Sequence, residues 1–381
     1  MFVKHKFCPL FNFRGRTIKN TELMQTQINE LKFSGHNIYV GIDAHLKSWR
    51  VTVMLNGVME KTFSQDPIAE KLQEYLHKRY PGGNYYSAYE AGFCGFSVHR
   101  SLERAGIKNI VVNPADIPVT DKEKRQKEDK RDSRKIARTL HNGELKGIHV
   151  PRRETEELRT FLRYRKTLVK EISRHKNRVK SLLHYYGISI PEIHQSASRH
   201  WSKRFTNWLR EVKFETSPGR ATLDRTIATV EFLRKQLLET TRDIKKLSEG
   251  SLSRHVALLR TVPGIGLIMA MTLLSELEEV MRFRNLDSLC SYVGLIPTTH
   301  SSGDSDKTGN ITPRSNKWLR NMIVESSWIA IRHDPTLMLC YQEKCKSMKG
   351  TDAIIRVAKK LLNRIRHVLK NNEAYQIAVV K

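Results

Sequence analysis

The feature that most constrains the fold is a regular succession of apolar runs and turn signals between residues 38 and 112. Apolar residues that alternate with polar ones predict strands, and apolar residues three and four positions apart predict helices. The dipeptide Asn56-Gly57 favours a two-residue hairpin. The predicted elements, in order, are strands Ile38–Asp43, Trp49–Leu55 and Val58–Phe63, helix Ile68–Tyr80, strand Tyr85–Glu90, helix Phe96–Ala105 and strand Ile110–Val112.

Three antiparallel strands followed by helix, strand, helix and strand is the order of elements in the ribonuclease H-like α/β fold. In that fold the first and fourth strands lie side by side. The first predicted strand ends on Asp43 and the fourth ends on Glu90. We therefore expect these two carboxylates to meet at adjacent strand ends, where a following helix can bring further acids against them.

A strongly basic segment follows the last of these strands. Between Lys122 and Arg138 it holds nine Lys or Arg and four Asp or Glu residues. Two of the acids, Asp129 and Asp132, share a face if the segment is helical. Crowded carboxylates repel one another, and a hard divalent cation such as Mg²⁺ relieves that repulsion. Taken alone, however, the pair is typical of a solvated, charged helix.

Together with Asp43 and Glu90, the pair predicts a different role. Four acids from two strand ends and one helix can hold two Mg²⁺ ions about 3.5–4 Å apart, as in two-metal phosphoryl-transfer sites. The basic residues around the pair, including Lys130, Arg131 and Arg134, suit a polyanion held over the metal ions.

The charge of the whole chain indicates the kind of partner. Lys and Arg number 67 against 39 Asp and Glu, which gives the 381-residue chain a formal charge of +28. A field this positive predicts binding to nucleic acid or to an anionic membrane. No apolar run approaches the ~18–20 residues that a membrane span needs, so we expect nucleic acid and no membrane. The five cysteines form no CxxC pair, which favours a reducing compartment and no zinc site.

The rest of the chain is predicted to be mainly helical. We divide it into an extension (1–36) that is partly disordered with a short helix at Glu22–Leu31, the α/β domain (37–150), a helical region (151–250) and a C-terminal α-helical domain (251–381). Long helices near Leu158 and Leu223 predict an antiparallel pair or coiled coil. The first of them has a basic back formed by Arg159, Arg163, Lys166, Lys170 and Arg174. Between the helices, Trp201, Phe205 and Trp208 share a predicted helix face. The alternatives are stacking on bases or, as is usual for such stripes, packing in a core or a dimer contact.

The C-terminal domain contains two further candidate sites. The turn Val262–Gly266 joins two predicted helices and resembles a helix-hairpin-helix element, in which Pro263, Gly264 and Gly266 let backbone N–H groups approach a phosphate. The alternative is a tight interhelical turn. Ser302 lies in a predicted polar loop over residues 298–306. A serine nucleophile needs a base or a metal to activate it, and local sequence alone favours ordinary turn chemistry.

A set of motifs spread over residues 37–375 changes this balance. They are Gly41-Ile42-Asp43, Tyr89-Glu90-Ala91-Gly92, Asp129-x-x-Asp132-Ser133-x-x-Ile136-Ala137, Val262-Pro263-Gly264-Ile265-Gly266, Tyr292-Val293-Gly294-Leu295-Ile296-Pro297, Ser302-Gly303, Lys317-Trp318-Leu319-Arg320, Asp334-Pro335 and Val357-Ala358-Lys359-Lys360-Leu361-Leu362. In number, order and spacing the chain resembles the bridge-RNA-guided DEDD transposases of bacterial insertion sequences, which are related to Piv-type DNA invertases.

The resemblance implies a RuvC-like nuclease domain in which Asp43, Glu90, Asp129 and Asp132 bind the metal ions. It implies that Ser302 is the nucleophile of the C-terminal transposase domain and forms a covalent link to a DNA phosphate. The implied partners are donor and target DNA, a structured noncoding bridge RNA, and further copies of the chain. The resemblance implies that the coiled coil in region 151–250 mediates dimerisation, and that two dimers assemble to a tetramer in the bacterial cytoplasm on the nucleoid. The residues expected to contact nucleic acid are Lys130, Arg131, Arg134, Pro263, Gly264, Gly266, Lys317 and Arg320.

Two alternatives to a transposase remain open at this level. A RuvC-like, structure-selective nuclease would use metal-activated water and would not depend on Ser302. A nucleic-acid-binding protein without catalysis would not depend on Asp43 or Glu90. The chain also departs from the family pattern at Pro313 and Ser315, close to the segment after Ser302.

Overall fold

The computed structural model describes residues 33–117, 129–194, 201–302, 305–312 and 315–377. The helix predicted at Glu22–Leu31 lies outside these residues. The chain divides into two compact units, Met1–Val150 and Pro151–Lys381, which are described separately below.

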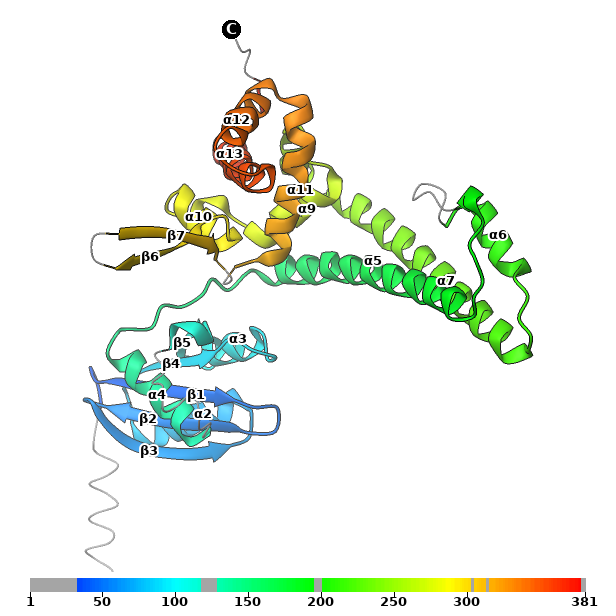
Figure 1. Ribbon diagram of the computed structural model, residues 1–381. Helices are drawn as coiled ribbons and strands as arrows, with labels where there is room; N and C mark the ends of the chain where they lie inside the picture. The colour runs from blue at the N-terminus through cyan, green and yellow to red at the C-terminus, as the bar shows by residue number, and fades with distance from the viewer. Residues whose placement is uncertain (1–32, 118–128, 195–200, 303–304, 313–314, 378–381) are drawn as a thin grey trace, which may run out of the picture. The chain divides into compact units, whose positions relative to one another are not determined.

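The N-terminal unit is a five-stranded mixed sheet with helices on both faces (Figure 1). The strand order is β3-β2-β1-β4-β5, with β1 antiparallel to β2 and parallel to β4. This confirms that the first and fourth strands are neighbours. The elements are β1 (Asn37–Ala44), β2 (Trp49–Leu55), β3 (Val58–Gln65), α2 (Ala69–Arg79), β4 (Asn84–Glu90), α3 (Ser97–Arg104), β5 (Lys108–Val112), the 3₁₀ turn η1 (Pro114–Asp116) and α4 (Asp129–His141).

Side-chain alternation along β1 separates the two faces of the sheet. Ile38, Val40 and Ile42 are fully buried and pack in one core with residues of α2 and α3. The intervening residues, Gly41 and Asp43 among them, face the opposite side, which α4 covers. The unit therefore has three layers, with the helix that carries the predicted acid pair alone on one face of the described sheet.

The second unit begins with a long helical arm. Helices α5 (Arg153–Tyr185) and α7 (Ser217–Ser248) run antiparallel, and α6 (Lys203–Glu211) lies near the far end of the pair, after the short turn η2 (Glu192–His194) (Figure 1). Phe205 is fully buried there and Trp201 is 6% exposed, both in a small core with apolar residues of α5 and α7. These aromatic side chains are therefore core residues. None of the described helices has an apolar stretch long enough to cross a lipid bilayer.

The remainder of the second unit is a helical domain around a large apolar core. Its elements are α8 (Ser253–Arg260), α9 (Leu267–Leu277), η3 (Val280–Arg282), α10 (Leu286–Val293), β6 (Pro297–Ser302), β7 (Ser305–Ile311), α11 (Lys317–His333), α12 (Pro335–Cys345) and α13 (Gly350–Asn371). The strands β6 and β7 form an antiparallel hairpin. The prediction of a polar loop over residues 298–306 was therefore wrong. The three Thr residues of these strands suit a two-stranded ribbon, although the strands lack the apolar alternation by which strands are recognised.

Candidate active site

Asp43 and Glu90 lie at neighbouring strand ends on the same face of the sheet. The parallel register pairs Ile42 with Tyr89, so the next residue on each strand is one of the two acids. Tyr89 is fully buried in the core under α2 and α3, which directs the side chain of Glu90 to the α4 face. The structure thus brings together the two acids predicted for these strand ends.

A close contact between α4 and strand β1 places the helix beside these acids. Gly41 has no side chain, and a Cβ at this position would lie 2.1 Å from the carbonyl oxygen of Ser133 and 2.4 Å from the backbone nitrogen of Ala137. Real Cβ atoms do not approach other atoms this closely. A glycine two residues before Asp43 is therefore what allows α4 to lie directly on β1.

Hydrogen bonds then fix the position of α4 along the sheet. The Ser133 hydroxyl lies 2.9 Å from the Thr52 hydroxyl in a buried contact, and Thr52 lies 3.0 Å from the Thr62 hydroxyl. Arg134 donates from its Nε to the same Thr62 oxygen at 3.2 Å. A helix with two consecutive residues bonded to strands β2 and β3 cannot slide or rotate without breaking these bonds. The position of the neighbouring Asp132 is set by the same contacts.

The first turn of α4 lies at the level of Asp43. At the far end of the helix His141 makes an edge contact with Tyr39, with 5.1 Å between ring centroids, while Gly41 lies against Ser133 and Ala137. Two strand residues span about 6.6 Å and each helix residue rises about 1.5 Å, so two residues of β1 match between four and five residues of α4. Extending the match to Asp43 leads to the first turn of α4, which begins at Asp129.

The side chains of Asp129, Lys130 and Arg131 lie outside the part of the chain that the structure describes. Asp132 is half-buried on α4. Within the described side chains, no group of three Asp, Glu, His or Cys residues is arranged to hold a metal ion. The four-acid site therefore remains a prediction, supported by the backbone positions of its members.

Two neighbours of Asp43 were not foreseen from the sequence. The His45 Nε2 atom lies 3.0 Å from the Asp43 Oδ2 atom. Arg50 is directly opposite Asp43 on β2 and donates a 2.9 Å hydrogen bond to the Ser64 hydroxyl. His45 lies just after the end of β1, two residues beyond Asp43. The arrangement places two basic residues beside the predicted ligand.

Ser302 is the last residue of β6, and its backbone pairs with Ser305 across the turn. At the base of this hairpin, the Thr312 backbone N–H and hydroxyl both donate to the carbonyl oxygen of Ile296, at 3.1 and 2.7 Å. Arg320 donates to the carbonyls of Gly294 and Thr312 at 3.4 and 3.2 Å. The guanidinium that was predicted to contact nucleic acid therefore also holds the hairpin to the start of α11.

Four other residues that were predicted to contact nucleic acid have distinct surroundings. A Cβ on Gly264 would lie 2.3 Å from the carbonyl oxygen of Ser326, so this glycine allows the turn after α8 to pack against α11. Gly266 is exposed at the start of α9 with open space around its Cα, and Pro263 is half-buried beside it. Lys317 is exposed on the first turn of α11. Gly264 thus fits a packing role, whereas Gly266 and Lys317 face solvent.

A buried carboxylate joins α5, α9 and α11. Glu276 is fully buried and accepts two hydrogen bonds from Arg163, at 3.0 and 3.1 Å, and one from the Asn316 side chain at 2.8 Å. Arg159 lies 3.6 Å from the same carboxylate. The prediction placed both arginines on the outward, basic back of α5. Instead they neutralise an acid inside the unit, which a helical pattern alone does not reveal.

Comparisons with known proteins agree with this arrangement. A family model described as a transposase, the DEDD domain of IS110 elements, matches residues 40–188, and the model described as "Transposase IS116/IS110/IS902 family" matches residues 256–342. The chain is 30% identical over 365 residues to the putative transposase y4rJ of Sinorhizobium fredii, covering 85% of this chain and 90% of that protein.

Two further relatives are similar over shorter stretches. The putative transposase y4qE of the same organism is 30% identical over 66% of this chain, a match that spans 60% of that protein. The transposase for insertion sequence element IS1533 of Leptospira borgpetersenii is 25% identical over 65% of this chain and 72% of its own length. The chain therefore belongs to the IS116/IS110/IS902 family of transposases.

Proposed function

We propose that the chain cuts and rejoins DNA strands during movement of an insertion sequence, with a RuvC-like site in the N-terminal unit. The observation that carries the proposal is the position of Asp43 and Glu90 at adjacent strand ends, under a helix whose first turn holds Asp129 and Asp132. The Gly41 contact and the Ser133 hydrogen bond supply the local reason for that position.

The chemistry of these residues fits a divalent metal. All four are carboxylates, the hard oxygen ligands that Mg²⁺ prefers. We propose that Asp43, Glu90, Asp129 and Asp132 hold Mg²⁺, most simply two ions. Bound there, the metal would offset phosphate charge and favour the ionised form of an attacking hydroxyl.

We further propose that Ser302 is the nucleophile. Its hydroxyl oxygen would form a bond to the phosphorus of a DNA phosphodiester as the bond from phosphorus to one deoxyribose oxygen breaks. The serine proton passes to solvent, and the departing oxygen leaves as a DNA hydroxyl. In rejoining, a hydroxyl of another strand displaces the serine oxygen and restores a phosphodiester. The family match to the C-terminal unit and the firm base of the β6–β7 hairpin support this assignment.

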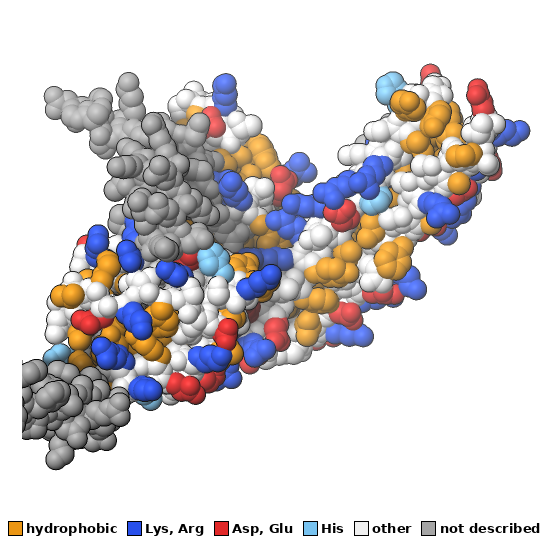
Figure 2. Space-filling view, turned by 90° about the horizontal axis from the view of Figure 1, so that it is seen from below, with side chains coloured by type: hydrophobic (Ala, Val, Ile, Leu, Met, Phe, Trp, Pro, Cys, Tyr) orange, Lys and Arg blue, Asp and Glu red, His pale blue; other side chains and the backbone are white. Residues whose placement is uncertain are grey.

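The proposed partners are donor DNA, target DNA and a structured bridge RNA, with base pairing to the RNA supplying most of the sequence specificity. The charge of +28 supports several nucleic-acid contacts. We propose assembly through the helical arm into dimers and then a tetramer. Lys and Arg side chains follow the arm beside hydrophobic ones (Figure 2). Large apolar side chains exposed on α5 and α7 include Tyr164, Val169, Phe232 and Leu238.

Trapping of covalent protein–DNA complexes tests the chemistry. Full-length protein is incubated with Mg²⁺, RNA transcribed from the DNA that flanks its gene, and DNA carrying the ends of the element, and is then denatured. We expect an adduct that disappears in Ser302→Ala and persists in the matched variant Ser301→Ala. Asp43→Asn and Glu90→Gln should remove both adduct and cleavage. Cleavage that persists without an adduct in Ser302→Ala would instead identify a nuclease that uses water.

A further inference from the structure

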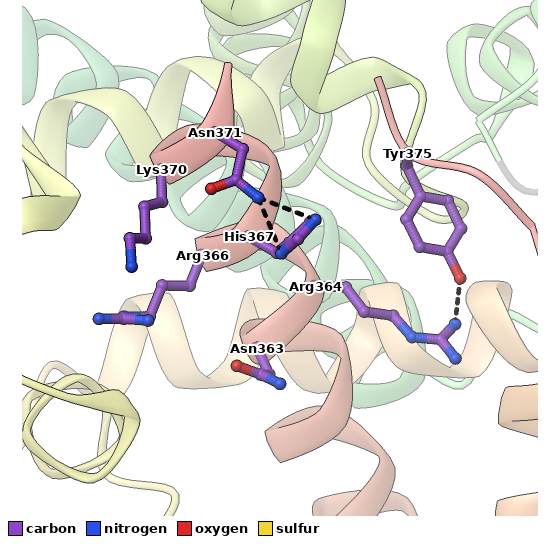
Figure 3. A pocket seen from close by; sticks show the side chains of 7 residues that line it. All are labelled: Asn363, Arg364, Arg366, His367, Lys370, Asn371 and Tyr375. Atoms are coloured by element: carbon purple, nitrogen blue, oxygen red, sulfur yellow. Dashed lines mark hydrogen bonds between the residues drawn. The ribbon is translucent and has the colours of Figure 1, made fainter. Parts of the chain in front are cut away.

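A basic cavity opens at the C-terminal end of α13, in the second unit. Its volume is about 350 Å³, which is within the range of small-ligand sites. Asn363, Arg366, His367 and Lys370 line it from the last two turns of the helix. Residues three and four positions apart share a helix face, so these side chains lie together. Figure 3 shows Arg366 and Lys370 directed to the same side of α13.

Two further lining residues, Arg364 of α13 and Tyr375 after it, belong to a separate polar cluster. Arg364 pairs with the fully buried carboxylate of Asp334, and the Tyr375 hydroxyl donates to the same carboxylate. The Tyr375 backbone N–H donates to the Thr261 hydroxyl at 2.8 Å, which ties the chain after α13 to the end of α8. Arg364 is thus already neutralised by Asp334, and Figure 3 shows its guanidinium bonded to the Tyr375 hydroxyl.

Arg366 and Lys370 have no such acidic partner among the described residues. Among the described residues, neither Arg366 nor Lys370 forms an ion pair, and no acid lines the cavity. The Nε atom of Arg366 is buried and meets no hydrogen-bond acceptor in the described structure. A buried guanidinium N–H without an acceptor is unfavourable, and an anionic oxygen in the cavity would supply the missing acceptor.

The helix end itself opposes an anion. The last carbonyl groups of a helix carry roughly half a negative charge. Arg366 and Lys370 carry two positive charges, and His367 adds a third when it is protonated. The side chains therefore outweigh the helix dipole, and the cavity has a net attraction for anions.

We propose that this cavity binds a phosphodiester of a nucleic-acid backbone, with Arg366 and Lys370 as the charged contacts and Asn363 as a neutral donor. The cavity is larger than a phosphate alone needs, which leaves room for the attached sugar. The choice of nucleic acid over another polyanion rests on the proposed function and on the charge of the chain. It does not depend on the metal site or on Ser302.

Binding of the full-length chain to nucleic acid tests the assignment. The variant Arg366→Gln/Lys370→Gln is compared with Lys344→Gln/Lys346→Gln, which removes the same charge from exposed positions just before α13. The 22 residues of α13 span about 33 Å, so the control positions lie far from the cavity. Equal melting temperatures of the variants establish that both are folded. Asn363→Asp supplies a second variant that adds a repelling charge at an exposed position.

Fluorescence anisotropy is recorded between roughly 50 and 200 mM salt with duplex DNA and, separately, with a structured RNA of matched length. We expect the cavity variant to bind at least one of these nucleic acids roughly tenfold more weakly, and the slope of log affinity against log salt to fall by about 1 to 2. Asn363→Asp should weaken the same complex, and the control pair should change the slope less.

The nucleic acid that loses affinity identifies the source of the phosphodiester. Wild-type affinity and slope of the cavity variant for both nucleic acids would overturn the proposal, as would an equal loss in the control pair. An acidic protein segment would then be the better occupant. This outcome is distinct from failure of the proposed function, which would appear as Asp43→Asn protein that still cleaves DNA.

Discussion

The contact between Gly41 and α4 allows a quantitative test of how the site is built. In Gly41→Ala, the new methyl group would lie 2.1 Å from the Ser133 carbonyl oxygen, whereas ordinary contacts begin near 3.4 Å. The helix must therefore move away from β1 by about 1.3 Å. Such a shift stretches the 2.9 Å contact between the Ser133 and Thr52 hydroxyls beyond hydrogen-bonding distance.

Two effects contribute to the expected loss of stability. Overpacking costs about 1–3 kcal/mol, and a lost buried hydrogen bond costs about 1 kcal/mol. We expect Gly41→Ala to lower the free energy of unfolding of the N-terminal unit by about 2–4 kcal/mol in urea titrations. Because a displacement of about 1 Å at a catalytic group can cost roughly a hundredfold in rate, DNA cleavage should fall further than stability alone explains.

Gly92→Ala is the matched control. Gly92 is exposed in the same unit, and a Cβ there would have only the Glu90 carbonyl oxygen nearby, at 3.9 Å. It should leave both stability and cleavage near wild type. Wild-type stability in Gly41→Ala would refute the close-packing argument. A destabilised variant with undiminished cleavage would refute the proposed link between the packing of α4 on β1 and the geometry of the site.

Four further predictions concern the second unit. Glu276→Gln removes the buried charge that two arginines share, and should lower the free energy of unfolding by roughly 3 kcal/mol in denaturant titrations; an unchanged midpoint would contradict it. Burial raises the pKa of the Cys290 thiol from 9.0 to about 11, so alkylation and peptide mapping at pH 8 should modify exposed Cys345 and leave Cys290 unmodified. The folded state binds the thiol proton more tightly than the unfolded state does. The stability that this difference contributes is therefore complete below pH 9 and is lost as pH rises through about 11. Urea titrations of the wild type and of Cys290→Ala across this pH range measure the loss. Tyr375→Phe deletes the hydrogen bond to Asp334 and should cost about 1 kcal/mol in the same titrations, whereas a larger loss would show that the ring also supports the core.

The sequence predicted much of the N-terminal unit because its signals are local. Apolar alternation located the strands, and Asn56-Gly57 located a hairpin whose central residues adopt positive φ. The order of elements predicted that Asp43 and Glu90 lie at neighbouring strand ends, and the parallel register of β1 and β4 confirmed it. The acids of α4 were predicted from spacing, but the glycine contact that seats their helix joins residues far apart in the sequence.

Other features could not be predicted because their partners are distant in sequence. The residues of β6 are polar and lack alternation, and the hydrogen bonds between Ile296 and Thr312 that close the hairpin become visible only in the fold. Arg320 has a motif position that suits a nucleic-acid contact, yet it donates to two backbone carbonyls. The sequence alone does not distinguish a basic side chain that donates to a carbonyl from one that donates to a carboxylate or a phosphate.

The buried carboxylate of Glu276 has a mechanical consequence. Both of its oxygens accept hydrogen bonds from Arg163 on the helical arm, and its Oε2 atom also accepts one from Asn316, which caps α11 directly after the β6–β7 hairpin. Twisting of α5 about its own axis would therefore pull on the root of the hairpin through a single side chain. If copies of the chain associate through the arm, a rotation of α5 on association would shift the strand that ends at Ser302. Assembly and the position of Ser302 would then be coupled.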